Sequence, residues 1–173
     1  MAPKIAVQGT GGSGKTTVAR ELAHRHGVPH VELDALFHGP NWVETPPEEF
    51  RRRVAAATAG DGWVVDGNYD SKLGDLVLGR ADTIVWLDLP LRVSLSRVTR
   101  RTLGRIRTGE ELWSGNRESW RGGFFGWNSM FVWVIRSHLR LRRARAIRLA
   151  RYPGLQVVRL RTPGEVKSYL TKN

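Results

Sequence analysis

Residues 9–16 read Gly-Thr-Gly-Gly-Ser-Gly-Lys-Thr and fit the pattern GxxxxGKS/T at every position. An apolar run, Lys4–Gln8, precedes this stretch, and apolar residues at helical spacing follow it over Lys15–His26. A strand, a glycine-rich turn and a helix form the context in which this pattern builds a phosphate-binding loop. Glycines let backbone N–H groups turn toward an anion, and the helix start adds its positive dipole end. The stretch therefore predicts a triphosphate site.

We expect ATP and Mg²⁺ as cofactors of this loop. Lys15 is the predicted catalytic cation at the β- and γ-phosphates, and the Thr16 hydroxyl is a predicted Mg²⁺ ligand. The residues predicted to bind the nucleotide here are Gly9, Gly11, Gly12, Ser13, Gly14, Lys15, Thr16 and Thr17.

Apolar runs alternate with helical patterns along the rest of the chain. This alternation predicts an α/β fold with a parallel sheet and helices on both faces. Further strands are expected at His30–Leu33, Trp63–Val65, Thr83–Leu87 and Leu155–Leu160. Further helices are expected at Pro46–Ala59, Ser71–Leu78, Val93–Arg107, Phe131–Arg151 and Gly164–Leu170, with a mobile glycine-rich and aromatic excursion at Gly104–Gly126.

Three aspartates stand at the ends of expected strands, where a metal-binding acid belongs. Asp66 is predicted to hold Mg²⁺ through water, with an ordinary Asp-Gly turn as the alternative. Asp34 is predicted to orient or deprotonate an acceptor hydroxyl, or to help hold Mg²⁺, with a helix N-cap as the alternative. Asp88 is predicted to cap the helix that follows it.

Arginines are the predicted clamps for the charge that develops during phosphoryl transfer. Arg97 and Arg101 are four residues apart and share one helix face. Arg117 lies in the glycine-rich segment, a suitable place for an arginine on a closing lid. The alternative for each of them is a solvated surface residue.

The charge is concentrated in one region. Residues 92–161 hold 17 arginines, no lysine and three glutamates, a formal charge of +14 against +12 for the whole chain. The expected helix carries seven of these arginines between Arg136 and Arg151, more than a triphosphate needs. Nucleic-acid binding through this helix is therefore an alternative, and contact with an anionic membrane surface is a weaker one.

Composition excludes several classes. The chain has 173 residues, enough for one domain with its own core, and no cysteine, which excludes disulfide frameworks, thiol nucleophiles and cysteine-based metal sites. It shows neither a signal-peptide pattern nor an apolar run long enough to span a membrane. We therefore expect a cytoplasmic protein without a membrane partner; the oligomeric state stays open.

These features together resemble the small P-loop kinases of the nucleoside-monophosphate-kinase group. Within it, the chain is similar to the adenylate-kinase-related DNA topology modulation (FlaR-type) proteins. The segments that carry the resemblance are GTGGSGKTT at 9–17, LDALFHGPNW at 33–42, WVVDGNY at 63–69, IVWLDLP at 84–90 with SRVTRR at 96–101, LWSGNRESW at 112–120 and VVRLRTPGEVKSYL at 157–170.

The resemblance implies a single kinase domain over residues 1–173 with a five-stranded sheet in the order 2-3-1-4-5. It also implies an acceptor-binding insert at about 34–60 and an arginine-bearing lid at about 102–126. By this resemblance Arg97 and Arg101 face the ATP, Asp66 serves Mg²⁺, and the loop after the last strand, with Arg161 and Pro163, lies near the adenine.

One departure concerns the acceptor. Adenylate kinases have an arginine in a DGFPR-type motif where this chain reads Asp-Gly-Asn-Tyr-Asp at 66–70. The predicted acceptor-binding residues are Asp34, Trp42, Arg53, Asn68 and Tyr69, and the substitute cation is Arg51, Arg52 or Arg53 on the expected helix of the insert. The expected acceptor is a nucleotide or a nucleoside. A metabolite of the kind used by shikimate kinase and a nucleic-acid end remain alternatives, as does a nucleic-acid-binding ATPase or regulator.

Overall fold

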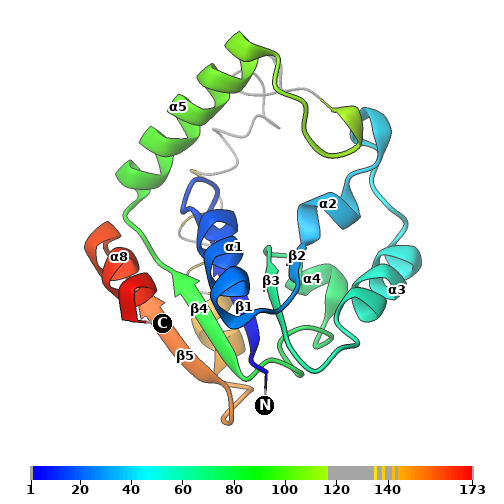
Figure 1. The fold of residues 1–173 in the computed structure, drawn as a ribbon, viewed down its shortest axis with the longest axis vertical. Helices are drawn as coiled ribbons and strands as arrows, with labels where there is room; N and C mark the ends of the chain where they lie inside the picture. Colours follow the sequence, from blue (N-terminus) through cyan, green and yellow to red (C-terminus); the bar gives the residue numbers. More distant parts are fainter. Residues whose placement is uncertain (1, 117–134, 136–137, 139–141, 143, 173) are drawn as a thin grey trace.

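A five-stranded parallel sheet forms the centre of the computed structural model, which describes residues 2–116, 135, 138, 142 and 144–172 (Figure 1). The strand order is β2-β3-β1-β4-β5, as expected. The strands are β1 (Lys4–Gly9), β2 (His30–Glu32), β3 (Trp63–Asp66), β4 (Thr83–Leu87) and β5 (Gln156–Leu160).

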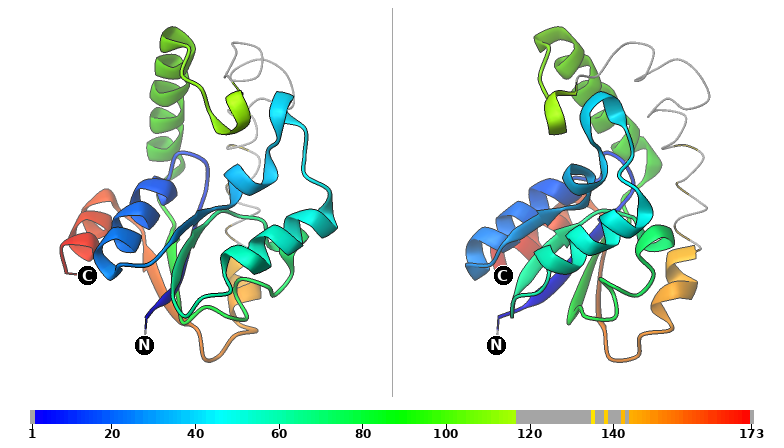
Figure 2. Two further views of the ribbon diagram at one scale, coloured as in Figure 1. Left: turned by 45° about the vertical axis from the view of Figure 1, so that its right-hand side comes forward. Right: turned by 90° about the vertical axis from the view of Figure 1, so that its right-hand side faces the viewer.

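Helices cover both faces of this sheet (Figure 2). They are α1 (Lys15–His26), α2 (Leu33–Phe37), α3 (Pro47–Ala57), α4 (Asp70–Leu73), α5 (Leu91–Thr108) and α8 (Pro163–Lys172), with short 3-10 turns η1 (Pro40–Trp42) and η2 (Trp113–Gly115). Residues 144–149 are helical too; most of the rest of the helix expected at Phe131–Arg151 falls outside the described residues.

The strand residues alternate between two apolar cores, as the period of two in a strand requires. Ile84 and Trp86 face the core made with α3, α4 and Leu149. Val85 and Leu87 face the core made with α1 and α8. Both faces of the sheet are therefore buried, which is the normal condition of a parallel sheet.

The carboxyl ends of the strands meet at one edge, where the candidate site lies. The register pairs Val7 and Glu32 with Asp66, so β2 and β3 end together and β1 runs two residues further, to Gly9. From β4 the chain runs into α5, and the segment after α5 then crosses to η2, beside η1 (Figure 1).

Several expected boundaries were wrong for local reasons. The helix expected at Ser71–Leu78 ends at Leu73, because Gly74 adopts a φ of 61° and terminates it. The helix after β4 begins at Leu91 and continues to Thr108. It therefore includes residues 104–108, the first residues of the expected glycine-rich excursion. Leu33 starts α2 instead of ending β2. The predicted capping role of Asp88 is also wrong: α5 has no side-chain cap, and Asp88 instead accepts hydrogen bonds from Arg159 on the neighbouring strand.

Within the described ranges, no helix is both long and apolar enough to cross a membrane.

Candidate active site

The glycine-rich loop connects β1 to α1 and packs against α5. Gly12 has a φ of 76°, and a Cβ there would lie 2.3 Å from the Ser94 carbonyl oxygen, so only glycine fits. Gly14 has a φ of 89° and immediately precedes α1. The tight loop therefore results from its own glycines and from the close approach of α5.

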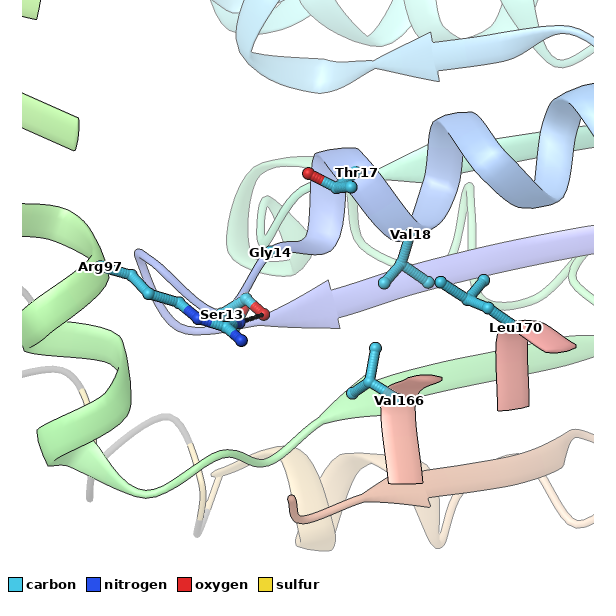
Figure 3. Close-up of a pocket in the computed structure, with 7 residues that line it drawn as sticks. All are labelled: Ser13, Gly14, Thr17, Val18, Arg97, Val166 and Leu170. Atoms are coloured by element: carbon cyan, nitrogen blue, oxygen red, sulfur yellow. Dashed lines mark hydrogen bonds between the residues drawn. The ribbon is translucent and has the colours of Figure 1, made fainter. Parts of the chain in front are cut away.

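A pocket of about 310 Å³ opens beside this loop (Figure 3). Its walls come from the loop, α1, α5 and α8: Ser13, Gly14, Thr17, Val18, Arg97, Val166 and Leu170. The Arg97 guanidinium reaches across from α5 and donates a hydrogen bond to the Ser13 carbonyl oxygen at 3.2 Å. The pocket combines a cation and loop atoms with the aliphatic side chains of α8. This combination suits a ligand with both an anionic group and an apolar ring.

The residues predicted to lie near the adenine, Arg161 and Pro163, come directly before the part of α8 that lines the pocket. Arg161 is exposed, its backbone N–H donates to the Glu165 carboxylate at 2.7 Å, and Pro163 begins α8. The side chains of α8 that line the pocket are instead Val166 and Leu170, which the sequence did not indicate.

Asp66, at the end of β3, has an oxygen that no described residue bonds. The side chain is 2% exposed, its Oδ1 lies 3.8 Å from His30 Nε2, and its Oδ2 has no hydrogen bond to any residue of the described ranges. The Ser13 hydroxyl in the loop is also buried without a partner among these residues. Hard divalent cations take such oxygen atoms, so the residues present fit Mg²⁺.

Mg²⁺ at this position would depend on the nucleotide. No group of three or more His, Asp or Glu side chains in the described residues could hold a metal by itself. Mg²⁺ usually takes one or two protein oxygens and completes its shell with phosphate oxygens and water. Thr16, in the first turn of α1, supplies the other predicted protein oxygen.

Asp34 and Tyr69 form a hydrogen-bonded pair on the opposite side of the sheet edge. The Tyr69 hydroxyl donates to Asp34 Oδ1 at 2.6 Å and lies 3.5 Å from His38 Nε2. Burial raises the pKa of Tyr69, and the charge and hydrogen bond of Asp34 raise it further. Because the phenol therefore stays protonated, it is a fixed donor that orients the Asp34 carboxylate.

Glu32 adds a third carboxylate near Asp34 and Asp66. Burial raises the pKa of Glu32 above its ordinary value; a hydrogen bond from Trp113 opposes this shift, whereas the charges of Asp66 and Asp34 reinforce it. This end of the site is therefore negative, in contrast to the loop.

A hydrogen-bonded clasp joins residues 38–42 to residues 113–116, two segments far apart in the sequence. Asn116 is 5% exposed and holds both sides: its Oδ1 accepts from the Trp42 backbone N–H at 2.9 Å, and its Nδ2 donates to the Gly39 carbonyl at 2.9 Å. The Ser114 hydroxyl donates to the His38 carbonyl at 3.0 Å.

The clasp also gathers aromatic rings and strained backbone. Trp113 stacks on His38 at 6.0 Å between ring centroids, and Trp42 meets both rings edge-on. The positive-φ residues other than glycine in the described chain are Asn41, Trp42 and Ser114, all within the clasp. Strain of this kind concentrates at functional positions. The clasp therefore adds η2 to the predicted acceptor-binding residues around Asp34.

The structure brings together some of the other predicted residues and not others. Asn68 bonds to Gly9 at the start of the loop, with Nδ2 donating to the Gly9 carbonyl at 2.5 Å. Arg53 lies on the outer side of α3 and donates to Glu49 at 2.7 Å. Arg101 is exposed one turn beyond Arg97 on α5, and Arg117 is outside the described residues.

No protein-family model matches the chain. Its sequence is similar to curated kinases. A cytidylate kinase from Pyrococcus furiosus is 33% identical over 112 residues, 56% of each chain. A putative adenylate kinase from Thermococcus kodakarensis is 31% identical over 115 residues, 62% of each chain. The chain thus aligns with little more than half the length of the cytidylate kinases it matches.

Solved structures define the class of fold. A sugar kinase from Janibacter sp. HTCC2649 matches with a TM-score of 0.57 and 19% identity, covering 99% of this chain and 94% of the other. Shikimate kinase from Acinetobacter baumannii, in complex with shikimate, matches with a TM-score of 0.58 and 17% identity over 99% and 90% of the two chains. The chain has the P-loop kinase fold. Its sequence relatives include kinases of nucleoside monophosphates, whereas membership of the FlaR-type subgroup stays a prediction.

Proposed function

We propose that this chain is a kinase that transfers the γ-phosphoryl group of Mg-ATP to a hydroxyl or phosphate oxygen of a small acceptor, a nucleotide or a nucleoside. The observation that carries the proposal is the arrangement at one sheet edge. The phosphate loop with Lys15 and Arg97 stands on one side, and the Asp34–Tyr69 pair stands on the other. The similarity to cytidylate and adenylate kinases supports it.

The donor end binds the triphosphate. Backbone N–H groups of the loop and the start of α1 would surround the phosphates, while Lys15 and Arg97 offset the charge that grows on the transferred group. The ring of the nucleotide would occupy the pocket against Val166 and Leu170. Thr16 and Asp66, with Asp34 as the further candidate, would hold Mg²⁺, which neutralises phosphate charge when bound.

The acceptor end prepares the attacking oxygen. With a hydroxyl acceptor, Asp34 accepts its proton as the oxygen forms a bond to the γ-phosphorus and the bond from that phosphorus to the β-bridging oxygen breaks, releasing ADP. Tyr69 keeps the Asp34 carboxylate in place through its 2.6 Å hydrogen bond. An acceptor that already carries an ionised phosphate needs no proton removed, so Asp34 would then act by orientation alone.

The side chains of the acceptor end favour a hydroxyl-bearing acceptor. Carboxylates and rings gather there, while the candidate substitute cation Arg53 is engaged by Glu49. A nucleoside therefore fits better than a monophosphate among the expected acceptors. The hydroxylated metabolites phosphorylated by kinases of the shikimate type remain the alternative.

Binding of nucleic acid is not proposed, because contacts within the protein occupy arginines of the positively charged region 92–161, called here the basic segment. Arg142 pairs with Asp88 at 3.1 Å, and Arg148 donates to the Gly74 carbonyl at 2.8 Å. These contacts give part of the excess charge a structural use. A nucleic-acid partner through residues 136–151 stays an untested alternative.

A transfer assay with Mg-ATP tests the proposal. The acceptors are nucleosides, nucleoside monophosphates and hydroxylated metabolites, each compared with a buffer blank. We expect transfer to at least one nucleoside or nucleotide, reduced at least about 10²-fold by Lys15→Ala. Lys4→Ala, at the other end of β1, is the matched control and retains activity. Absence of transfer to every acceptor, or transfer that survives Lys15→Ala, would overturn the proposal.

A further inference from the structure

One arginine of the basic segment is buried beneath the phosphate loop. Arg145 is 5% exposed; its Nε donates to Gln8 Oε1 at 2.9 Å, and its Nη2 donates to Asn68 Oδ1 at 2.8 Å. Burial lowers its pKa to about 10, which leaves the guanidinium charged at neutral pH. The Trp86 ring lies 5.7 Å from the guanidinium carbon. The sequence places this arginine only among the seven of the basic helix that nucleic-acid binding would use.

The hydrogen-bond partners of the Arg145 guanidinium are unusual for a buried cation. Arg142 and Arg159 both pair with the Asp88 carboxylate. Among the described residues, by contrast, Arg145 has no ion pair, and its hydrogen bonds go to two neutral amide oxygens. Burying this cation has a large desolvation cost, which the charges of Asp70 and Asp88 offset only in part, since its pKa stays below the ordinary value. A residue that served packing alone would not need this charge.

The guanidinium fixes which way the two amides face. Arginine can only donate hydrogen bonds, so it requires the oxygens of Gln8 and Asn68 to point toward it. The NH₂ group of Asn68 is then directed to the Gly9 carbonyl at 2.5 Å, while its Oδ1 also accepts from the Gly9 N–H at 3.2 Å. The NH₂ group of Gln8 is directed to Asp70 at 2.8 Å.

Gly9 is the last residue of β1 and the first of the phosphate loop. Asn68 therefore holds both backbone groups of the residue from which the loop departs, and it stands two residues after Asp66. Because Arg145 orients the Asn68 amide, it influences the position of the phosphate loop and of the chain that follows β3 at the same time.

We propose that Arg145 is a positioning residue: it orients Asn68, which sets the backbone of Gly9 and with it the phosphate loop. The proposal rests on the proposed function only in taking the loop as the ATP site. It also gives the basic segment a role in donor binding that requires no nucleic acid.

Arg145→Gln tests this, with Arg148→Gln as the matched control. Arg148 lies on the same helical segment but bonds to the Gly74 carbonyl, away from the loop. We expect Arg145→Gln to weaken ATP binding and raise the KM for ATP about tenfold or more, because charge-assisted hydrogen bonds are lost, and to leave the KM for the acceptor unchanged. Arg148→Gln should stay within about twofold of the unmodified chain. Equal ATP affinities in the two variants would overturn the proposal.

Asn68→Asp separates positioning from folding. An aspartate at 68 gains an ion pair with Arg145, which offsets the lost hydrogen bond to the Gly9 carbonyl, so the protein should stay folded although that bond to the loop is gone. We expect this variant to weaken ATP binding as Arg145→Gln does; unchanged affinity in the folded protein contradicts the proposal. Arg145→Lys, which keeps the charge but bonds to fewer oxygens at once, should recover part of the affinity.

A fluorescent ATP analogue provides the readout, because its binding does not require an acceptor. If the unmodified chain binds the analogue but transfers phosphate to nothing, the proposed function fails while Arg145 remains testable. If transfer is observed but Arg145→Gln binds normally, the proposal for Arg145 fails alone.

Discussion

The two ends of the candidate site are built in opposite ways. The donor end is a contiguous loop of eight residues whose ligands are backbone N–H groups, with Lys15 and Arg97 as its cations. The acceptor end has carboxylates and rings, and its parts come from positions as distant as Glu32 and Asn116. A triphosphate requires the same phosphate-binding loop whatever the second substrate is. An acceptor, in contrast, requires side chains that match its own shape and polar groups. The difference teaches that, if the chain is the proposed kinase, its acceptor specificity resides in tertiary contacts rather than in a contiguous motif.

Asp34→Asn should have the largest effect, and this effect should fall on the acceptor end and not on the donor end. The amide still accepts the Tyr69 hydrogen bond but no longer takes a proton, so we expect kcat with a hydroxyl acceptor to fall about 10³-fold. ATP-analogue affinity should change less than about twofold. The exposed Asp61→Asn is the control. A variant with normal kcat would break the assignment of Asp34 to the acceptor end.

Arg97→Ala should affect the donor end. The lost charge beside the loop is expected to lower kcat about 10²-fold and to weaken ATP binding, since a hydrogen bond to a charged group contributes ~1.5–3 kcal/mol. Steady-state kinetics with ATP varied measures both. Arg100→Ala, three residues further on α5, is the matched control; equal losses in the two variants would remove Arg97 from the site.

Asn116→Ala should loosen the clasp. Three backbone groups lose a partner: the Trp42 N–H and the Gly39 and Trp113 carbonyls. We expect the KM for the acceptor to rise about tenfold, with ~1–3 kcal/mol of stability lost and the KM for ATP unchanged. Ser114→Ala, which removes a single exposed hydrogen bond, should have a smaller effect. A rise in the KM for ATP instead would show that the clasp serves the donor end.

Arg53→Gln should have the smallest effect. Because this guanidinium is bonded to Glu49 on the outside of α3, we expect acceptor kinetics within about twofold of the unmodified chain. The bonds of Arg52 and Arg53 lower the pKa of Glu49 to about 2. NMR titration of the Glu49 carboxyl should therefore show a higher pKa in the variant. A large rise in the KM for the acceptor would restore Arg53 as the substitute phosphate cation.

The fold and the conformation of the glycine-rich loop were predictable because their signals are local. The loop motif, the apolar strands and the strand-end position of Asp66 are all readable without knowing which strands are neighbours, whereas the roles of the loop residues and of Asp66 stay predictions. Asp88 was misassigned for the opposite reason: its partner Arg159 lies on β5, and only the strand order brings them together.

The acceptor end could be predicted only in part. Asp34, Tyr69 and Trp42 stood in recognisable segments, but the bond that places Trp42 joins residues 74 positions apart. Arg145 could not be selected among seven arginines without knowing which helix face meets the sheet. Its spacing of three from Arg142 and from Arg148 makes it a neighbour of each on the helix surface, but such spacing is shared by other arginines of the segment and does not single it out.

Phosphorus NMR of the chain mixed with Mg-ATP and a panel of nucleosides and nucleoside monophosphates tests the central claim most directly. We predict that the ATP resonances are replaced by those of ADP together with one new phosphorylated product, in equal amounts, and that Lys15→Ala prevents both changes. ATP that stays intact with every acceptor, or ADP accompanied only by inorganic phosphate, would contradict the claim that the two ends form one phosphotransfer site.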